Sequence, residues 1–334
     1  MPLKGVPVQL KSWASNFSVA PTVAPVFRSL ITLLLKLLVW LRRASPNHGK
    51  MMNNNILTLV KTTNPDAASL KPVDKALFGQ VHLVGAGPGD AELITVKAMR
   101  LLQEADAVVY DRLANPELLE YARDRCDLIY VGKKKDQHSL PQEQICELLA
   151  VLARCGKNVV RLKGGDNFIF GRGGEEVDHL NKQGVECSVV PGITAAIGCA
   201  AATQIPLTHR DHAHAVTFIT GHRQNGQMYI NWDLALQKDS TVVFYMGLSN
   251  LEEITSQLLQ RGCPADKPFA VVAQGTSNNQ QVVLGTISDI AERLKAMPLP
   301  SPALLMMGDV IKANGYAQYL ADQTLAGYPA IAQA

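Results

Sequence analysis

The chain has 334 residues, of which 47% are hydrophobic and 18% charged, and its formal net charge is +3. This composition fits a globular protein with a large core, and the length is sufficient for two domains. The positive charge is concentrated in residues 1–65, which hold eight Lys and Arg and no acid, and leave 24 cations against 29 acids elsewhere. A mildly acidic body argues against general nucleic-acid binding.

Residues 1–79 form a basic extension that differs in composition from the rest of the chain. Its apolar run at residues 30–41 is interrupted by Lys36 and is too short for a membrane span, and it lacks the cleavage site of a secretory signal. Three interpretations stay open. The first is a disordered or dispensable leader, with Met51 or Met52 as the true start. The second is an organelle transit peptide. The third is a peripheral membrane anchor, whose cations flank leucines and a tryptophan.

Strands and helices alternate from residue 81 onward. Strands are expected at residues 81–84, 107–110, 128–131, 159–162 and 186–190. Helices are expected at 92–104, after Pro116, from Ser139 as N-cap to about 154, from about 174, and after Thr194. This alternation predicts a parallel or mostly parallel sheet covered by helices on both faces.

The second half of the chain restarts the pattern after a polar linker at residues 207–214. Strands are expected at 216–220, 241–245, 269–273, 282–284 and 303–307, and helices at 251–260 and 287–295. The predicted organisation is an α/β chain with an N-terminal domain at 80–206, a C-terminal domain at 215–320 and a tail at 321–334. Each domain is expected to be a mixed or mostly parallel sheet flanked by helices.

Residues 161–176 concentrate more unusual chemistry than a plain surface loop. Several glycines stand there with three cations and three acids, directly after an apolar strand. Glycine lets a backbone approach a ligand closely, and Arg and Lys bind carboxylates or phosphates. We interpret this stretch as the wall of a ligand site.

The glycine-rich turn at residues 85–90 follows a strand and precedes a helix, as in dinucleotide-binding folds, and Asp111 lies where a ribose-binding acid would stand. A nicotinamide-dependent oxidoreductase is therefore one alternative. The spacing argues against it, because Asp90 occupies the position where a glycine packs the helix on the strand and Pro88 removes a backbone donor. A purely structural turn is the other alternative.

Polar residues follow several of the predicted strands, where open α/β sheets bind their ligands. Asp111 can accept a proton while Arg112 holds an anion, although the two also fit an ordinary surface ion pair. Residues 133–135 are three lysines that form either an anion-binding rim or a solvated face. Residues 164–166 allow close backbone contact and an acceptor carboxylate, and residues 171–174 fit an anion-binding nest.

Histidines and cysteines give no clear metal site. His209, His212 and His214 cluster with Asp211, but their spacing matches no standard zinc pattern, so contact with a substrate or a linker role is favoured over metal binding. The six cysteines form no C-x-x-C pair, which predicts neither a metal cluster nor a disulfide framework and favours a reducing cytoplasm.

Several segments, taken in this order, resemble the uroporphyrinogen-III C-methyltransferases of the tetrapyrrole methylase family. They are residues 84–90, 109–113, 131–133, 141–143, 160–176, 190–195, 205–210, 220–222, 245–247 and 274–276. The resemblance covers about residues 80–320 and is specific, because many short motifs keep the same order.

The resemblance implies the two-domain tetrapyrrole methylase fold, with S-adenosyl-L-methionine bound in the cleft between the domains and a homodimer as the assembly. It implies methyl transfer to C2 and C7 of uroporphyrinogen III, which gives precorrin-2 by way of precorrin-1 and releases S-adenosyl-L-homocysteine. The product would feed sirohaem, cobalamin or haem d1 synthesis. No metal is implied.

Residue roles carried over by position are expectations of the same kind. The proton acceptor falls on Asp111 and the proton donor on Lys133. The cofactor contacts fall on Pro88, Gly164, Gly165, Asp166, Ile169, Thr194, Ala195, Met246 and Gly275. The substrate carries many carboxylates, for which we expect these partners: Arg112, Lys134, His138, Lys163, Arg172 and Arg210.

Two departures from the family pattern qualify the expected activity. Asn167 stands where family members commonly place proline after Gly-Gly-Asp, which predicts a less rigid loop. Residues 1–79 match nothing in the family and are too short for the dehydrogenase–ferrochelatase module of sirohaem synthases, so methylation alone is expected. A related methylase acting on a precorrin or diphthine, and a non-enzymatic regulator that binds the cofactor, are the remaining alternatives.

Overall fold

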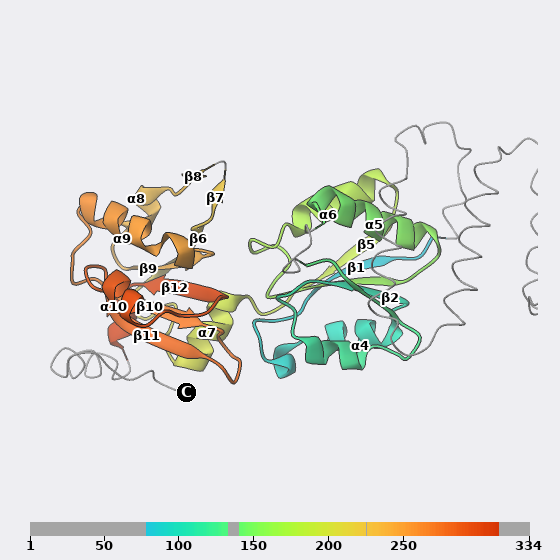
Figure 1. Ribbon diagram of the computed structural model, residues 1–334, viewed down its shortest axis with the longest axis horizontal. Coiled ribbons are helices and arrows are strands. Elements are labelled where there is room, and N and C mark those ends of the chain that lie inside the picture. The colour runs from blue at the N-terminus through green and yellow to red at the C-terminus, as the bar shows by residue number, and fades with distance from the viewer. Residues whose placement is uncertain (1–77, 133–139, 225, 314–334) are drawn as a thin grey trace, which may run out of the picture. The chain divides into compact units, whose positions relative to one another are not determined.

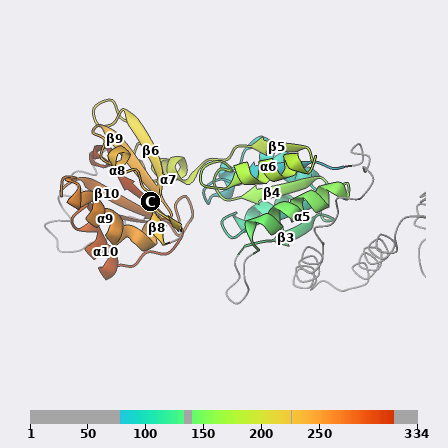
Figure 2. The ribbon, with the colours of Figure 1, turned by 90° about the horizontal axis from the view of Figure 1, so that it is seen from above.

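The computed structural model describes residues 78–132, 140–224 and 226–313, and the described chain contains two five-stranded sheets flanked by helices (Figures 1 and 2). The predicted α/β fold is therefore confirmed. The predictions for residues 1–77 and for the tail at 321–334 lie outside the described residues.

The first sheet has the strand order β3-β2-β4-β1-β5, and every neighbouring pair in it is parallel. Its strands are β1 (Val81–Gly85), β2 (Ala107–Tyr110), β3 (Asp127–Tyr130), β4 (Val159–Lys163) and β5 (Cys187–Val190). Because all five run in the same direction, the loops that follow them emerge at one edge of the sheet.

Helices cover both faces of this sheet, as predicted, with α4 (Val96–Glu104) on the face opposite to α5 (Gln142–Arg154) and α6 (Gly173–Lys182) (Figure 1). The α4 face is apolar: Ala98 and Leu102 of the helix pack with Val84, Val160 and Leu162 of the strands. Two 3-10 turns, η3 (Ala91–Leu93) and η4 (Pro116–Tyr121), complete this side.

Two helix starts differ from the sequence prediction. The helix expected at residues 92–104 is divided, because Asp90 caps η3 by accepting from the Glu92 N–H and Thr95 caps α4 by accepting from the Ala98 N–H. Helix α5 begins after Pro141, which occupies the N-cap position expected for Ser139 and makes no side-chain capping bond. A side-chain cap therefore accounts for the start of α4 but not for that of α5.

The second sheet is mixed and has the order β11-β10-β12-β9-β6. Strand β6 (Ala215–Thr220) pairs parallel with β9 (Ser240–Tyr245), whereas β12 (Ala303–Met307), β10 (Pro268–Ala273) and β11 (Gln281–Thr286) pair antiparallel. A two-stranded hairpin is formed by β7 (Arg223–Gln224) and β8 (Gln227–Met228).

Each face of the second sheet has its own apolar core. Helices α8 (Trp232–Ala235), α9 (Leu251–Gln260) and α10 (Ile290–Ala296) cover one face, where Ile254 and Leu258 pack on Phe244. Helix α7 (Ala195–Thr203) and η6 (Asp309–Lys312) cover the other face. The 3-10 turn η5 (Leu248–Asn250) belongs to the first of these faces, because Leu248 packs against the core there.

Helix α7 precedes the predicted domain limit at residue 206, yet its buried face belongs to the second sheet's core. Ala196 and Cys199 of α7 pack with Val243, Val272 and Leu304. The structure thus attaches this helix by packing to the sheet that follows it in the chain. Within the described residues, no helix has the length and apolar character needed to cross a membrane.

Candidate active site

Three loops meet where β4, β1 and β5 end, because these strands are neighbours in the first sheet. We name them the β1 loop (residues 86–90), the β4 loop (residues 164–172) and the β5 loop (residues 191–194). Gly87 and Gly165 join the first two loops by a pair of backbone bonds: the Gly87 N–H donates to the Gly165 carbonyl at 3.2 Å, and the Gly165 N–H to the Gly87 carbonyl at 2.6 Å.

The glycines at this junction are required by close backbone contact. A Cβ atom on Gly85 would lie 2.4 Å from the Gly192 nitrogen, and one on Gly192 would lie 2.3 Å from the Gly165 carbonyl oxygen. Neither position has room for a side chain, so glycine alone lets the three loops pack together. The glycine-rich turn at 85–90 therefore packs loop against loop in this structure.

Asp166 holds the β4 loop to the β5 loop. Its Oδ2 atom accepts from the Gly192 N–H at 3.0 Å, and its Oδ1 atom accepts from the Phe168 N–H at 2.8 Å. A carboxylate oxygen has two acceptor positions, so each oxygen still has one acceptor position beyond these bonds. The carboxylate is thus oriented and can accept a further hydrogen bond from an amine or hydroxyl.

Asn167 is a fully buried residue of the β4 loop and binds two strands of the first sheet, β1 and β5. Its Nδ2 atom donates to the carbonyl of Leu83 at 3.1 Å and to that of Val190 at 3.0 Å, and its backbone carbonyl accepts from the Gly173 N–H. We expected a less rigid loop from the loss of the family's proline. The side chain instead ties the loop to β1 and β5, a connection that proline cannot make.

Asp111 lies at the end of β2, next to β4, and pairs with a buried arginine of β4. Its Oδ2 atom is 2.9 Å from the Nη2 atom of Arg161, whose side chain is 4% exposed, and its Oδ1 atom accepts from the Leu113 N–H. The Arg161 Nη1 atom also donates to the carbonyls of Val109 and Leu162. Three bonded partners thus fix the guanidinium, which in turn fixes one oxygen of Asp111.

The same arginine continues into a buried cluster on the face covered by α5 and α6. The Arg161 Nε atom is 3.3 Å from Glu176 Oε1, and Lys163 Nζ is 2.9 Å from Glu176 Oε2. Gln142 of α5 donates to Glu176 Oε1, and Lys163 also donates to the Gly171 carbonyl of the β4 loop. Desolvation lowers the pKa of Lys163, while the neighbouring Glu176 opposes that shift. We call these residues (Arg161, Lys163, Glu176 and Gln142) the buried charge cluster.

The predicted substrate contact at Lys163 is therefore occupied by interactions inside the protein. The residue is 5% exposed and both its bonded partners belong to the protein. In this arrangement Lys163 stabilises the β4 loop by its bond to the Gly171 carbonyl. Its proposed contact with substrate stays a prediction that would require the side chain to leave Glu176.

Backbone strain gathers in the same loops and in two loops of the second sheet. Among the described residues, seven non-glycine residues have a positive φ, and five of them lie in these loops. They are Phe170, Arg172, Met246, Gln274 and Thr276. Non-glycine residues rarely adopt this conformation, and strained residues cluster at functional sites. Met246 and Gly275, both expected cofactor contacts, belong to or adjoin this set.

The remaining expected cofactor contacts lie on loops joined by direct packing. A Cβ atom on Gly198 would lie 2.4 Å from the Pro88 side chain, and one on Gly275 would lie 2.3 Å from the Cys199 sulfur. The Asp90 N–H donates to Thr276 Oγ1 at 3.1 Å. Residues of the β1 loop, of α7 and of the loop after β10 are thus in contact.

The expected cationic partners of the substrate fall into three groups. Arg112 and Arg210 are exposed, and Arg172 is exposed and paired with Glu175 at 2.7 Å. Lys163 is buried, as described above. Lys133, Lys134 and His138 lie outside the described residues.

The histidine cluster forms no metal site in the described part of the chain. The rings of His209 and His212 contact each other in a tilted arrangement with centroids 4.7 Å apart, and His209 Nδ1 accepts from the Asp211 N–H. No group of three or more His, Cys, Asp or Glu side chains suited to a metal ion occurs in residues 78–132, 140–224 and 226–313.

The sequence segments singled out above include three residues that organise this site but received no individual role: Arg161, Glu176 and Tyr245. A signal existed for the first, because Arg161 and Lys163 alternate with Val160 and Leu162 in a strand that is otherwise apolar. Charges inside a buried strand need a buried partner, which points to an acid on a covering helix. No comparable pattern indicated Tyr245, whose partners come from distant parts of the sequence.

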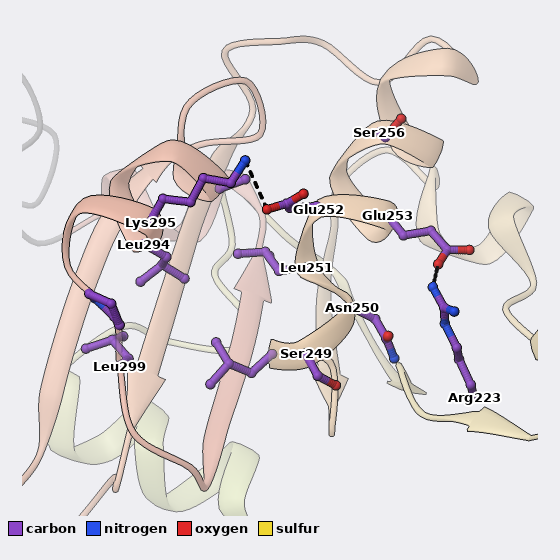
Figure 3. A pocket seen from close by; sticks show the side chains of 13 residues that line it. Arg223, Ser249, Asn250, Leu251, Glu252, Glu253, Ser256, Leu294, Lys295 and Leu299 are labelled. Atoms are coloured by element: carbon purple, nitrogen blue, oxygen red, sulfur yellow. Dashed lines mark hydrogen bonds and ion pairs between the residues drawn. The ribbon is translucent and has the colours of Figure 1, made fainter. Parts of the chain in front are cut away.

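A groove in the second half of the chain, of about 770 Å³, is distinct from these loops (Figure 3). Leu251 of α9 and Leu294 of α10 line it, and Lys295 pairs with Glu252 at 3.0 Å beside them. Its lining contains none of the expected catalytic, cofactor or substrate residues. The groove therefore adds no chemistry to the strand-end loops.

Comparison with known proteins places this geometry in a family. The family model of the tetrapyrrole (corrin/porphyrin) methylases matches residues 80–291. A siroheme synthase of Thioalkalivibrio sulfidiphilus is 52% identical over 236 residues, which are 71% of this chain and 48% of that protein. The chain thus spans about half the length of the curated relatives it matches.

Solved structures give the same result. A uroporphyrin-III C-methyl transferase from Thermus thermophilus, complexed with S-adenyl homocysteine, is 38% identical with a TM-score of 0.61, over 70% of this chain and 99% of that one. A cobalt precorrin-4 methyltransferase is 26% identical with a TM-score of 0.63, over 73% and 99% of the two chains. This chain, with its glycine-packed loops beside an arginine-held aspartate, belongs to the tetrapyrrole (corrin/porphyrin) methylases.

Proposed function

We propose that this chain transfers methyl groups from S-adenosyl-L-methionine to C2 and C7 of uroporphyrinogen III, giving precorrin-2 by way of precorrin-1. The observation that carries the proposal is the position of Asp111, which the buried Arg161 holds beside the glycine-packed loops at the end of the first sheet. Family membership supports tetrapyrrole methylation, and the Thermus methyltransferase supports this substrate.

The loops fit a nucleoside-type methyl donor. Glycines at 164 and 165 let the backbone approach a ligand, and Asp166 presents an oriented carboxylate to hydroxyl or amine groups. We assign the cofactor contacts to the residues expected from the sequence: Pro88, Gly164, Gly165, Asp166, Ile169, Thr194, Ala195, Met246 and Gly275. The cofactor supplies an activated methyl group, so the protein's main task is to align it with the acceptor carbon.

Asp111 is proposed to accept the proton that the macrocycle loses, from a position other than the methylated carbon, once a methyl group has been added, and Lys133 to donate one. The pairing with Arg161 holds the carboxylate of Asp111 in one orientation, which a positioned base requires. Lys133 directly follows Gly132, where a Cβ atom would lie 3.0 Å from the Arg112 nitrogen. Gly132, the residue before Lys133, is therefore close to Arg112, the residue after Asp111.

The substrate's carboxylates would meet cations around these loops. Arg112, Arg172 and Arg210 are exposed and suited to this, and Lys134 and His138 are proposed with them. Lys163 is the least suited of the expected partners because it is buried and paired with Glu176.

The proposal is limited to methylation. The siroheme synthase relatives extend beyond the matched region, and we propose no dehydrogenase or ferrochelatase activity for this chain. We propose a homodimer in the cytoplasm that supplies precorrin-2 to sirohaem, cobalamin or haem d1 synthesis, and these points rest on the family resemblance.

The direct test is a transfer assay with the full chain. Incubation with methyl-labelled S-adenosyl-L-methionine and uroporphyrinogen III under anaerobic conditions should place two labelled methyl groups on each macrocycle. Asp111→Asn should lower kcat by about 100-fold or more while the Kd for S-adenosyl-L-homocysteine stays unchanged. Cofactor binding without transfer to this macrocycle would favour another acceptor or a regulator, and the absence of both would reject the proposal.

A further inference from the structure

Tyr245, the last residue of β9, makes an unusual contact with the start of α7. Its hydroxyl oxygen is 2.6 Å from Thr194 Oγ1 and accepts from the Ala196 N–H at 3.0 Å. Thr194 occupies the N-cap position of α7, but its own side chain makes no capping bond. The Tyr245 hydroxyl therefore accepts the hydrogen bond from the first turn of α7 that an N-cap side chain normally accepts.

This replacement changes where the groups at the helix start are directed. A threonine that capped its own helix would turn Oγ1 toward the N–H groups of the first turn. Here Oγ1 is held by Tyr245 instead, and Ala196 has its partner in the phenol. The N–H of Ala195, at the first position of the helix, is one that the helix itself cannot satisfy. Thr194 and Ala195 are both proposed cofactor contacts.

The ring of Tyr245 also packs against the β4 loop, and the residue after Tyr245 in the chain has a strained backbone. Its centroid lies 5.0 Å from that of Phe170 in the β4 loop and 5.7 Å from that of Phe218 in β6. The next residue, Met246, is half exposed and has a φ of 55°. One side chain thus contacts or adjoins three segments that carry proposed cofactor contacts: residues 164–170, 194–195 and 246.

Burial raises the pKa of the Tyr245 phenol, although its bonds to Thr194 and Ala196 oppose that shift. The phenol therefore keeps its proton at neutral pH, and the hydroxyl can serve the helix N–H as acceptor while it shares a bond with Thr194. The arrangement needs the hydroxyl and not merely the ring, because phenylalanine would preserve both aromatic contacts and lose both hydrogen bonds.

We infer that Tyr245 is a positioning residue for the cofactor, which caps α7 from β9 and thereby orients Thr194, Ala195 and Met246. This inference rests on the proposed binding of S-adenosyl-L-methionine by these loops. Tyr245 acts through its neighbours, so its removal should weaken cofactor binding more than it changes the affinity for the macrocycle.

The experiment measures the Kd for S-adenosyl-L-homocysteine by calorimetry with the full-length protein. Tyr245→Phe should raise this Kd by about tenfold, since it removes two partly buried hydrogen bonds. The KM for the tetrapyrrole should stay unchanged. Thr255→Val is the matched control, because it removes another buried hydroxyl, bonded to the Leu251 carbonyl within α9, and should leave the Kd unchanged.

A double-mutant cycle with Thr194→Val separates positioning from a general loss of stability. If Tyr245 acts through Thr194, Tyr245→Phe should have a smaller effect on the Kd in the Thr194→Val background than alone. Equal effects in both backgrounds would overturn the inference. The cycle also remains informative at low temperature if Tyr245→Phe is less stable, since binding is measured on the folded fraction.

The outcomes distinguish this inference from the proposed function. A wild-type protein that binds the ligand, with an unchanged Kd for Tyr245→Phe, overturns the positioning role and leaves the proposed function intact. A wild-type protein that does not bind S-adenosyl-L-homocysteine overturns both. A weaker Kd in Tyr245→Phe with a normal Kd in Thr255→Val supports the inference.

Discussion

The Nη2 atom of Arg161 lies 2.9 Å from the Oδ2 atom of Asp111, and the arginine side chain is 4% exposed. The proposed base, Asp111 at the end of β2, is thus held by the guanidinium of Arg161, which is itself held inside the protein by bonds to other residues. Arg161 also contacts Glu176 and two strand carbonyls, so its planar fork has no freedom to follow a moving partner.

Arg161→Lys should therefore reduce catalysis although it keeps the charge. A lysine cannot bond Asp111, Glu176 and both carbonyls at once, so the Asp111 carboxylate would lose its fixed orientation. We expect kcat to fall by about 100-fold with an unchanged Kd for S-adenosyl-L-homocysteine. Arg154→Lys, at an exposed arginine of α5, is the control. An unchanged kcat in Arg161→Lys would show that Asp111 needs no such support.

Glu176 should be more important for stability than its number of contacts suggests, because it is the buried acid that neutralises two buried cations. Glu176→Gln should lower the free energy of unfolding by about 3 kcal/mol, since Lys163 and Arg161 would share too little negative charge. The exposed neighbour pair gives the control: Glu175→Gln, which breaks the bond to Arg172, should cost less than about 1 kcal/mol.

Removal of both partners should cost less than the two single losses together. The double variant Glu176→Gln with Lys163→Met leaves no uncompensated lysine, so its free energy of unfolding should exceed the additive expectation. Urea denaturation of the four proteins measures this coupling. Strict additivity would contradict the view that Lys163 is held by Glu176.

Asn167 should tolerate neither charge nor truncation, because its amide donates to two strand carbonyls from a fully buried position. Asn167→Ala should lower the free energy of unfolding by about 1 to 3 kcal/mol, because two acceptors lose their donor. Asn167→Asp should cost more at neutral pH, where a carboxylate would face two carbonyl oxygens. The same changes at Asn181, exposed on α6, serve as controls.

The pH dependence of Asn167→Asp has a definite sign. The new carboxyl can donate one hydrogen bond only when protonated, so its pKa in the folded state should rise above the unfolded value of about 3.9. Its contribution to stability is then present below that value and is lost as the pH rises toward neutrality. A variant whose stability, relative to the wild type, increased from pH 4 to pH 7 would contradict the buried contact.

The thiols should differ in reactivity according to burial. Burial raises the pKa of Cys199 to about 12 and those of Cys126 and Cys187 to about 11. Burial also raises the pKa of Cys155, against the effect of Lys157, but this thiol is the exposed one, at the end of α5. Since the thiolate is the reactive form, iodoacetamide at pH 8 should modify Cys155 first and Cys199 only after unfolding. Mass spectrometry of timed digests measures the order, and early modification of Cys199 would contradict its packing beneath Gly275.

The sequence predicted the layered fold and the position of the loops because both follow from local patterns. Alternating apolar strands and helices specify a covered parallel sheet, and glycines directly after strands mark the ligand edge. The expected acid Asp111 indeed stands at a strand end beside the β4 loop. Helix starts were less accurate, because hydrophobic spacing does not report the capping bond of Thr95 or the proline at position 141 that precedes α5.

The supporting contacts could not be predicted in the same way. Glu176 and Arg161 are 15 residues apart and meet only because α6 covers one face of β4, and Tyr245 reaches Thr194 from 51 residues away. Such contacts depend on tertiary packing and not on local spacing. Asn167 shows the same limit: its identity suggested a looser loop, whereas its burial lets the amide join two strands.

The central claim is methylation of uroporphyrinogen III at two defined carbons, and the most direct test is the structure of the product. The full chain is incubated anaerobically with uroporphyrinogen III and S-adenosyl-L-methionine carrying a ¹³C-methyl group, and the product is examined by NMR. The account predicts two labelled methyl groups, on C2 and C7, and almost none with Asp111→Asn. Labelled methyl groups at other carbons, or transfer that Asp111→Asn leaves unchanged, would contradict it.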